Sequence, residues 1–316
     1  MADSKGGSSL GPKVIVAVID SGVDYNHPDL KDEMWKNPKE IPRNGIDDDN
    51  NGIVDDVYGA DMHTRWSNKK GNPFDDYGHG THCAGIIAAS ANNGRGIAGV
   101  AGQTKGKVKI MAVKTTNATG YGSISSALAG LQYAIANGAK ISSHSYRLKT
   151  NGYSNSILER ILRKNPQHLL VSATGNDSGK RSLKNLFPAG NRAPNHICVA
   201  ALDEKGKKAW YSNYGLPYAH VFAPGSEIFS TYPRNEYIAA TGTSMACPQV
   251  SGLAALVMSM RGRVTAVEVK KLIEQNVVKK SKFKRYVTTG GQIDVGKTIG
   301  AVSEKYPNYD YYDYFD

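Results

Sequence analysis

Short apolar segments rich in β-branched residues recur along the chain and alternate with helical patterns. The first, residues 13–19 (KVIVAVI), lies between a Gly-Pro turn and an Asp-Ser-Gly sequence, and similar runs follow at 108–113, 169–172 and 197–201. Strands that are apolar at nearly every position are typical of a sheet that is buried on both faces. We therefore predict an α/β protein with three layers, α/β/α, around a mostly parallel central sheet.

Helical patterns lie between and after these runs. Residues 123–136 form one helical pattern that ends at Asn137-Gly138, as a C-cap would. Residues 244–260 are apolar nearly all round, which predicts a buried helix, and Thr265 with Glu268 forms a capping box that opens a helix to about residue 277. By contrast, residues 32–74 are polar and rich in Asp, Asn and Gly, and a loop of that length is usually functional.

One domain is expected at residues 13–300, after a short N-terminal arm at 1–12 and before an acidic-aromatic tail at 301–316 that we expect to be disordered. Much of the net charge of +11 comes from lysines and arginines within 261–285, where only two aromatic residues are interleaved. We interpret that run as a solvated surface and predict no nucleic-acid partner. No apolar run reaches about 18 residues, so no membrane span is predicted.

The sequence contains three cysteines, Cys83, Cys198 and Cys247, and all lie in apolar surroundings. An odd and sparse set of this kind predicts buried free thiols rather than a disulfide framework.

Three motifs bring together the residue types that nucleophilic catalysis requires. Asp20 lies in VIDSGVD (18–24) directly after the first predicted strand, His79 lies in GHGTHCAG (78–85), and Ser244 lies in GTSMACP (242–248) at the start of the buried helix. A serine hydroxyl needs a neighbouring base, and the base needs a carboxylate that fixes its tautomer. The order Asp, His, Ser differs from the order in chymotrypsin-like proteases and in α/β-hydrolases.

Together these motifs resemble those of the subtilases, the subtilisin-like serine proteases, from about residue 13 to residue 277. The loop GIDDDNNGIVDDVYGAD (45–61) is more similar to the proteases of apicomplexan-related protozoa than to the secreted bacillar enzymes. The resemblance implies a subtilisin-like serine endopeptidase in which Asp20 orients His79, His79 acts as general base and then acid, and Ser244 attacks the scissile carbonyl. His82 is the rival base, and the resemblance gives it a structural role.

The resemblance also assigns an oxyanion residue and a substrate cleft. Asn176, which follows a buried strand within SATGND (172–177), matches the subtilase asparagine that donates to the oxyanion. At the nucleophile side of the cleft, Tyr146-Arg147 replaces the usual Leu-Gly, so larger side chains narrow or charge the cleft. The residues expected to bind substrate are Gly120, Tyr121, Gly122, Ser145, Tyr146, Gly175 and Leu186.

One or two structural Ca²⁺ sites are predicted. Within residues 47–56, hard oxygen ligands alternate around a glycine, as in calcium loops, although the glutamate at the twelfth position of an EF-hand is absent. The alternative is a solvated acidic loop. The predicted ligands of the first site are Asp47, Asp49, Asn51, the Ile53 carbonyl and Asp56. The resemblance implies a second site, without an identifiable ligand from the N-terminal arm, at Asp29, Ala91, Asn93, Arg95 and Ile97.

The resemblance further implies a protein or peptide substrate, a propeptide or protein inhibitor, a zymogen stage and a monomer. It also implies secretion or a secretory compartment, although residues 1–13 are small, polar and Gly-rich and do not form a signal peptide. Two other functions stay open. One is a transpeptidase or macrocyclase on the same scaffold, and the other is a non-catalytic, calcium-stabilised binding module, which the intact triad disfavours.

Overall fold

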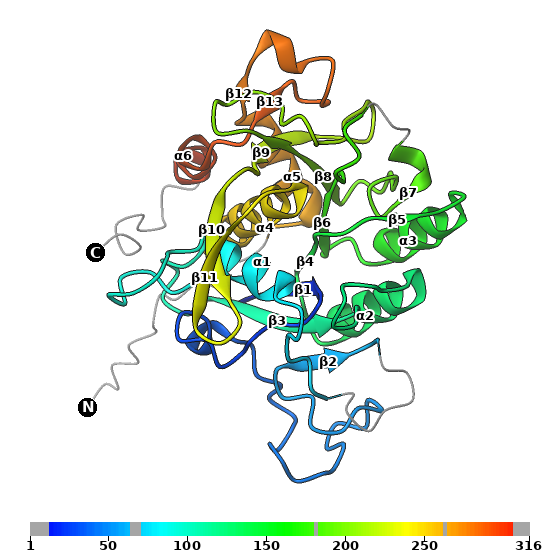
Figure 1. Cartoon of the computed structure of the whole chain (residues 1–316), viewed down its shortest axis with the longest axis vertical. Coiled ribbons are helices and arrows are strands. Elements are labelled where there is room, and N and C mark those ends of the chain that lie inside the picture. Colours follow the sequence, from blue (N-terminus) through cyan, green and yellow to red (C-terminus); the bar gives the residue numbers. More distant parts are fainter. Residues whose placement is uncertain (1–12, 64–70, 180–182, 262–263, 306–316) are drawn as a thin grey trace, which may run out of the picture.

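The structure is a computed structural model that describes residues 13–63, 71–179, 183–261 and 264–305. Its centre is a nine-stranded sheet with the strand order β12-β13-β9-β8-β6-β4-β1-β3-β2 (Figure 1). The strand pairs are parallel except for the antiparallel pair β12–β13 at one edge. The strands are β1 (Val14–Asp20), β2 (Gly59–Asp61), β3 (Val108–Lys114), β4 (Ile141–His144), β6 (Leu169–Ala173), β8 (His196–Leu202), β9 (Val221–Pro224), β12 (Val278–Lys279) and β13 (Gly291–Gln292).

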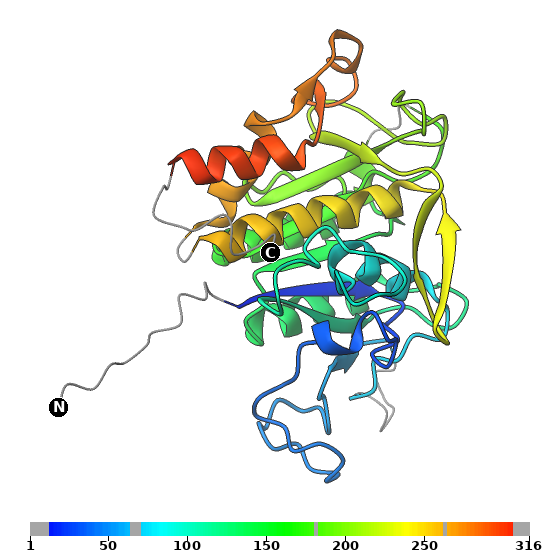
Figure 2. The same ribbon diagram turned by 90° about the vertical axis from the view of Figure 1, so that its left-hand side faces the viewer.

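Helices cover both faces of this sheet (Figures 1 and 2). Residues of β1 alternate between the two layers: Val16 and Val18 pack with the first group of helices, and Ile19 packs with the second. Because helices cover both faces of the sheet, the residues of β1 that point to either face are apolar. The first group is α1 (His79–Ala88), α4 (Thr243–Met260), α5 (Ala266–Gln275) and α6 (Val295–Lys305), and the second is α2 (Ile124–Ala136) and α3 (Tyr153–Lys164).

Smaller elements complete the fold. Two antiparallel pairs lie outside the main sheet, and short 3₁₀ helices lie in the connections. They are β5 (Leu148–Lys149) with β7 (Leu186–Phe187), β10 (Ile228–Tyr232) with β11 (Glu236–Ala240), η1 (Lys31–Glu33), η2 (Leu183–Asn185) and η3 (Ser281–Phe283).

The predicted three-layer α/β/α fold is confirmed, and most predicted elements begin or end within two residues of the observed ones. Ser123 caps α2, and the capping box of Thr265 and Glu268 opens α5, which ends at Gln275 rather than near residue 277. The start of the tail that we expected to be disordered is helical instead, because residues 301–305 continue helix α6. The rest of that tail and the arm at 1–12 lie outside the described residues.

All three cysteines are buried and free, as predicted. Among the helices of the described segments, none has the length and apolar character needed to cross a bilayer.

Three histidines are buried within or next to the sheet. The Ser142 hydroxyl lies 2.9 Å from Nε2 of His144 and 2.8 Å from Nε2 of His168, and His196 Nε2 lies 2.7 Å from the Ser172 hydroxyl. Burial lowers the pKa of His168 to about 4 and the pKa of His196 to about 3, and it holds the pKa of His144 well below its usual value. All three imidazoles are therefore neutral in the folded protein near pH 7.

We expect the free energy of unfolding to decrease as the pH falls below about 6.5. The three histidines then bind protons in the unfolded chain but stay neutral in the folded protein. For each such histidine the free energy of unfolding decreases by about 1.4 kcal/mol per pH unit as the pH falls, until the pH reaches the folded-state pKa of that histidine. His168→Gln should flatten this dependence by about that slope between pH 6.5 and the pKa of about 4. Denaturant unfolding at several pH values, in a Ser244→Ala background that prevents self-digestion, measures the difference. Parallel curves for the two proteins would contradict the prediction.

Candidate active site

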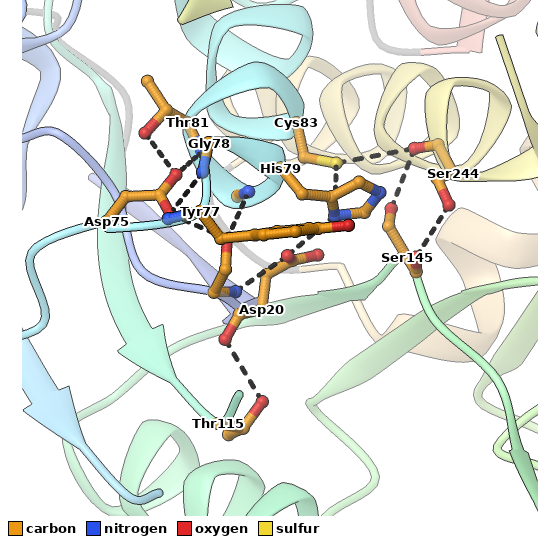
Figure 3. Close-up of polar contacts among 12 residues, drawn as sticks. Asp20, Asp75, Tyr77, Gly78, His79, Thr81, Cys83, Thr115, Ser145 and Ser244 are labelled. Carbon is orange, nitrogen blue, oxygen red and sulfur yellow. Dashed lines mark hydrogen bonds and ion pairs between the residues drawn. The ribbon is translucent and has the colours of Figure 1, made fainter. Parts of the chain in front are cut away.

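Asp20 and His79 come from two elements that meet at the carboxyl edge of the sheet. Asp20 is the last residue of β1, which lies between β3 and β4, and its backbone carbonyl accepts a hydrogen bond from the Thr115 N–H at 2.7 Å. Its Oδ1 accepts the Ser21 N–H at 2.8 Å and lies 2.7 Å from Nδ1 of His79, the first residue of α1 (Figure 3). A buried carboxylate therefore holds one nitrogen of the imidazole and leaves the other available.

The carboxylate of Asp75 fixes the start of helix α1 relative to β1. Asp75 is 1% exposed, and its Oδ1 accepts hydrogen bonds from the Ser21 hydroxyl at 2.9 Å and from the Gly78 N–H at 2.8 Å. Its Oδ2 accepts both the N–H and the hydroxyl of Thr81 (Figure 3). Because Ser21 follows Asp20 and Gly78 precedes His79, Asp75 connects the two segments. The sequence analysis missed this residue, and its signal was an acidic residue just before a helix start.

Ser244 lies in the first turn of α4, beside the end of β4. Its hydroxyl donates to the Ser145 carbonyl at 2.8 Å, and the Ser145 hydroxyl donates in return to the Ser244 carbonyl at 2.9 Å. Figure 3 shows the His79 ring between Asp20 and Ser244. Cys83 Sγ lies 4.0 Å from His79 Nδ1 and 3.5 Å from the Ser244 carbonyl oxygen, so all three residues are neighbours.

Within the described residues, no hydrogen bond joins Ser244 to His79, because the serine hydroxyl points to Ser145 instead. In proteins without bound substrate, the hydrogen bonds of a catalytic group are often long or misaligned. Asp20, His79 and Ser244 therefore lie together at this edge of the sheet, with the serine hydroxyl turned toward another acceptor.

The two rival histidines have different surroundings. Burial opposes the charged form of His79, but the charge of Asp20 and their hydrogen bond outweigh it, so the pKa of His79 is raised well above its usual value. Burial lowers the pKa of His82, whose Nε2 lies 3.1 Å from the Ile238 carbonyl. Only His79 of these two is paired with Asp20, and its side chain is 27% exposed.

Asn176 lies beyond the end of β6 and faces the start of α4. Its Oδ1 accepts hydrogen bonds from the Thr243 N–H at 2.9 Å and from the Thr243 hydroxyl at 2.8 Å. These two hydrogen bonds fix the orientation of the Asn176 side-chain amide, whose Nδ2 is its hydrogen-bond donor. A Cβ placed on Gly242 would lie 3.1 Å from that Nδ2, so the donor lies at the N-terminus of α4, next to Ser244.

The residues predicted to bind substrate fall into two groups. One group is a turn in which the Asn117 N–H donates to the Tyr121 carbonyl, Gly122 forms a bridge with Thr116, and Tyr121 is 75% exposed. Gly120 in this turn has φ +77°, a backbone conformation that favours glycine, and lies against the Tyr77 ring.

The second group surrounds the ends of β4 and β6. Ser145 contacts Ser244 directly, and Gly175 precedes Asn176. The Tyr146 hydroxyl lies 2.7 Å from Nδ1 of His144. Leu186 is buried in β7, which pairs with β5.

The first predicted calcium loop contains a cluster of carboxylates. Asp49 and Asp56 lie with Glu40, and one oxygen of each is within 4.8 Å of the others. The Asn51 amide donates to Asp56 at 2.9 Å. Asp47 has a different contact, because its carboxylate accepts backbone N–H groups of the same loop at 3.0 Å and 2.7 Å.

Glu40 was missed by the sequence analysis, because it lies outside the acidic run. Its Oε2 is buried and has no hydrogen-bond partner among the described residues. Burial raises the pKa of both Glu40 and Asp56, and neighbouring carboxylates act in the same direction. The Ile53 side chain is buried in the core, and its N–H donates to Asn51. A hard cation fits this set of oxygens and would compensate their repulsion.

The second predicted calcium site has a different pattern of contacts. Asp29 is fully buried, and its Oδ1 accepts the Asn93 amide at 2.7 Å. Its Oδ2 accepts the Ile97 N–H at 3.1 Å and the Tyr237 hydroxyl at 2.8 Å. The Arg95 N–H donates to the Asn93 side chain, and Ala91 donates its N–H to Gly102. Protein donors thus contact both Asp29 oxygens in this structure, and the second site stays a prediction from the sequence.

Comparison with known proteins gives one consistent family. The chain matches the subtilase family over residues 11–296. It is 35% identical over 303 residues to subtilisin-like protease 1 of Plasmodium falciparum, with 90% of this chain and 43% of the relative covered. Its identity to subtilisin-like protease 1 of Plasmodium vivax is 33% over 308 residues, with 90% and 46% covered. Its identity to thermitase of Thermoactinomyces vulgaris is 35% over 285 residues, with 87% and 85% covered.

The chain therefore spans less than half the length of these two Plasmodium relatives, but most of the length of thermitase. The predicted resemblance to protozoan subtilisin-like proteases is confirmed by the Plasmodium proteins. The family match includes Asp20, His79 and Ser244 within one continuous segment. On this evidence the chain belongs to the subtilase family.

Proposed function

We propose that this protein hydrolyses peptide bonds through an acyl-enzyme on Ser244. The observation that carries the proposal is the 2.7 Å contact between Asp20 and His79, with Ser244 beside the same imidazole. In the free protein the Ser244 hydroxyl donates to Ser145, and a rotation of its side chain turns it toward His79. His79 then takes the hydroxyl proton as the oxygen attacks the scissile carbonyl, and Asp20 stabilises the resulting imidazolium.

Two donors would stabilise the oxyanion of the tetrahedral intermediate. They are Asn176 Nδ2, whose amide is fixed by Thr243, and the Ser244 N–H at the N-terminus of α4. The helix dipole adds partial positive charge there. One side-chain donor of this kind contributes about 10²–10³-fold to kcat. His79 finally returns its proton to the leaving amine, and water releases the acyl group by the same route in reverse.

We further propose that residues 13–300 form the catalytic domain and that a peptide binds as an added strand between segments 120–122 and 145–147. A propeptide or protein inhibitor would use the same cleft, and secretion and a monomeric state remain proposals from the family resemblance. Subtilases generally bind structural calcium. In this chain Glu40, Asp49, Asp56 and Asn51 would hold the ion, which would neutralise the buried carboxylates.

Ser244→Ala should fold but lose hydrolysis, with kcat lower by about 10⁶-fold, because the nucleophile is absent. Peptide-library digestion measures the activity, and a fluorophosphonate probe should label the parent protein and not the variant. Product analysis by mass spectrometry distinguishes hydrolysis from the transpeptidase alternative, which would join an added amine to the acyl fragment. Failure to label the folded parent protein would favour the non-catalytic binding module.

The acidic limb of the kcat/KM profile should lie above pH 6.5, because His79 must be neutral to accept a proton and its pKa is raised. Asp20→Asn removes the charge that raises this pKa. The limb should therefore move to lower pH while the maximal rate falls by about 10⁴-fold. Initial rates from about pH 5 to about pH 9 measure both changes. A limb that stays in place in the variant would show that Asp20 does not set the pKa of His79.

Chelation should lower the melting temperature of the parent protein, since a cation that binds only the folded state stabilises it by about 2.7 kcal/mol at 100 times its Kd. Glu40→Gln should weaken Ca²⁺ binding and reduce the difference between calcium-loaded and chelated protein. Calorimetric titration with Ca²⁺ and thermal unfolding provide the two readouts. Asp32→Asn, which changes an exposed carboxylate outside the cluster, is the matched control. Equal calcium dependence in the Glu40 variant and the control would refute the assignment.

A further inference from the structure

Arg147 lies two residues after Ser145, whose carbonyl accepts the Ser244 hydroxyl. The segment 145–147 therefore starts at the nucleophile and leads away from it into β5. Segment 145–147, which follows β4, lies beside the loop that follows β6, because β4 and β6 are neighbouring parallel strands. That loop contains Gly175 and Asn176.

The Arg147 side chain extends from the first segment to the second. A Cβ placed on Gly175 would lie 2.6 Å from Arg147 Cδ and 3.2 Å from its Nε, so the arginine lies directly against this glycine. The guanidinium Nη2 donates to Asp177 Oδ1 at 2.5 Å. Asp177 is itself held by Asn213, which donates to its Oδ2 at 2.9 Å and accepts its N–H at 3.0 Å.

The space between these two segments is where the residue that carries the scissile carbonyl must place its side chain. The carbonyl oxygen has to face Asn176 Nδ2 and the Ser244 N–H, while the peptide backbone pairs with segment 145–147. The side chain of that residue then points between segments 145–147 and 175–177. Arg147 forms one wall of this space, and Gly175 forms another.

In this ion pair the cation is the more exposed partner and the anion is the more buried one. The Arg147 side chain is 34% exposed, whereas the Asp177 side chain is 14% exposed. A guanidinium has five N–H donors, and within the described part of the chain Asp177 is the acceptor found for Arg147. The guanidinium therefore has further N–H donors, which a carboxylate or a carboxamide of the substrate could accept.

We propose that Arg147 determines cleavage specificity by selecting substrates with an acidic or carboxamide side chain immediately before the scissile bond. The arginine also occupies space that a large aromatic side chain would need, and its charge disfavours lysine and arginine at that position. Asp177 fixes the guanidinium in place rather than contacting the substrate. This inference rests on the proposed peptidase function and specifies its substrate class.

The experiment compares peptides that differ only in the residue before the cleaved bond, with Asp, Gln, Phe and Lys as the four choices. The kcat/KM of the parent protein should be highest for Asp and Gln. Arg147→Met keeps the length of the side chain but removes its charge, and it leaves Asp177 facing the space. The ratio of Asp to Lys cleavage should then fall by about tenfold or more and turn in favour of Lys, since a hydrogen bond to a charged group is lost.

Two further variants make the outcome specific to charge. Arg147→Lys should retain a preference for Asp over Lys, and Asp177→Asn, which removes the balancing anion, should increase that preference. Arg160→Met changes an exposed arginine on α3 and should leave all ratios as in the parent protein. Thermal unfolding of each variant shows that it is folded. Unchanged ratios in both the Arg147→Met and Asp177→Asn proteins, or a shift in the same direction in both, would overturn the proposal.

The peptide series also separates this inference from the proposed function. Ser244-dependent cleavage that is indifferent to Arg147 would leave the peptidase intact and refute the specificity role. Absence of cleavage of every peptide, together with absence of fluorophosphonate labelling, would refute the peptidase and the specificity role with it.

Discussion

The parallel ladder of β1, β4 and β6 is the constraint on which the site depends. Its hydrogen bonds hold three strand ends at one edge of a sheet that is buried on both faces, so the segments that follow them cannot shift independently. Asp20 is the end of the first strand, Ser145 follows the second, and Asn176 follows the third. Helices α1 and α4 then bring their first turns to the same edge, where helix N-termini favour negative charge.

The layers and the strand positions could be predicted because each strand is short, rich in β-branched residues and apolar on both faces, as strands of a covered parallel sheet are. The positions of Asp20, His79 and Ser244 could be predicted because they lie at strand ends or helix starts within short motifs. Asp75 and Glu40 could not be identified in this way. Asp75 contacts Ser21, and Glu40 lies with Asp49 and Asp56. Asp75 and Glu40 themselves lie outside the motifs and the acidic run that the sequence analysis used, so a local sequence pattern does not indicate the contacts.

The differences between prediction and structure lie where side-chain contacts, rather than secondary structure, decide the outcome. Asp47 and Asp49 look equivalent in the sequence, and both accept the Asn51 N–H of their own loop, yet Asp49 is the one that lies in the carboxylate cluster with Glu40 and Asp56. At the second predicted calcium site, donors from Asn93, Ile97 and Tyr237 contact the Asp29 carboxylate, and the site stays a prediction. Charge density alone does not distinguish a ligand from a residue that stabilises a turn.

The hydrogen bond from the Ser244 hydroxyl to the Ser145 carbonyl has a consequence for timing. A peptide that adds as a strand along segment 145–147 needs that same carbonyl as an acceptor for one of its own N–H groups. In the proposed mechanism, hydroxyl and peptide would therefore compete for a single oxygen, and the arriving peptide would displace the hydroxyl toward His79. The substrate itself would then free the hydroxyl that is to attack it.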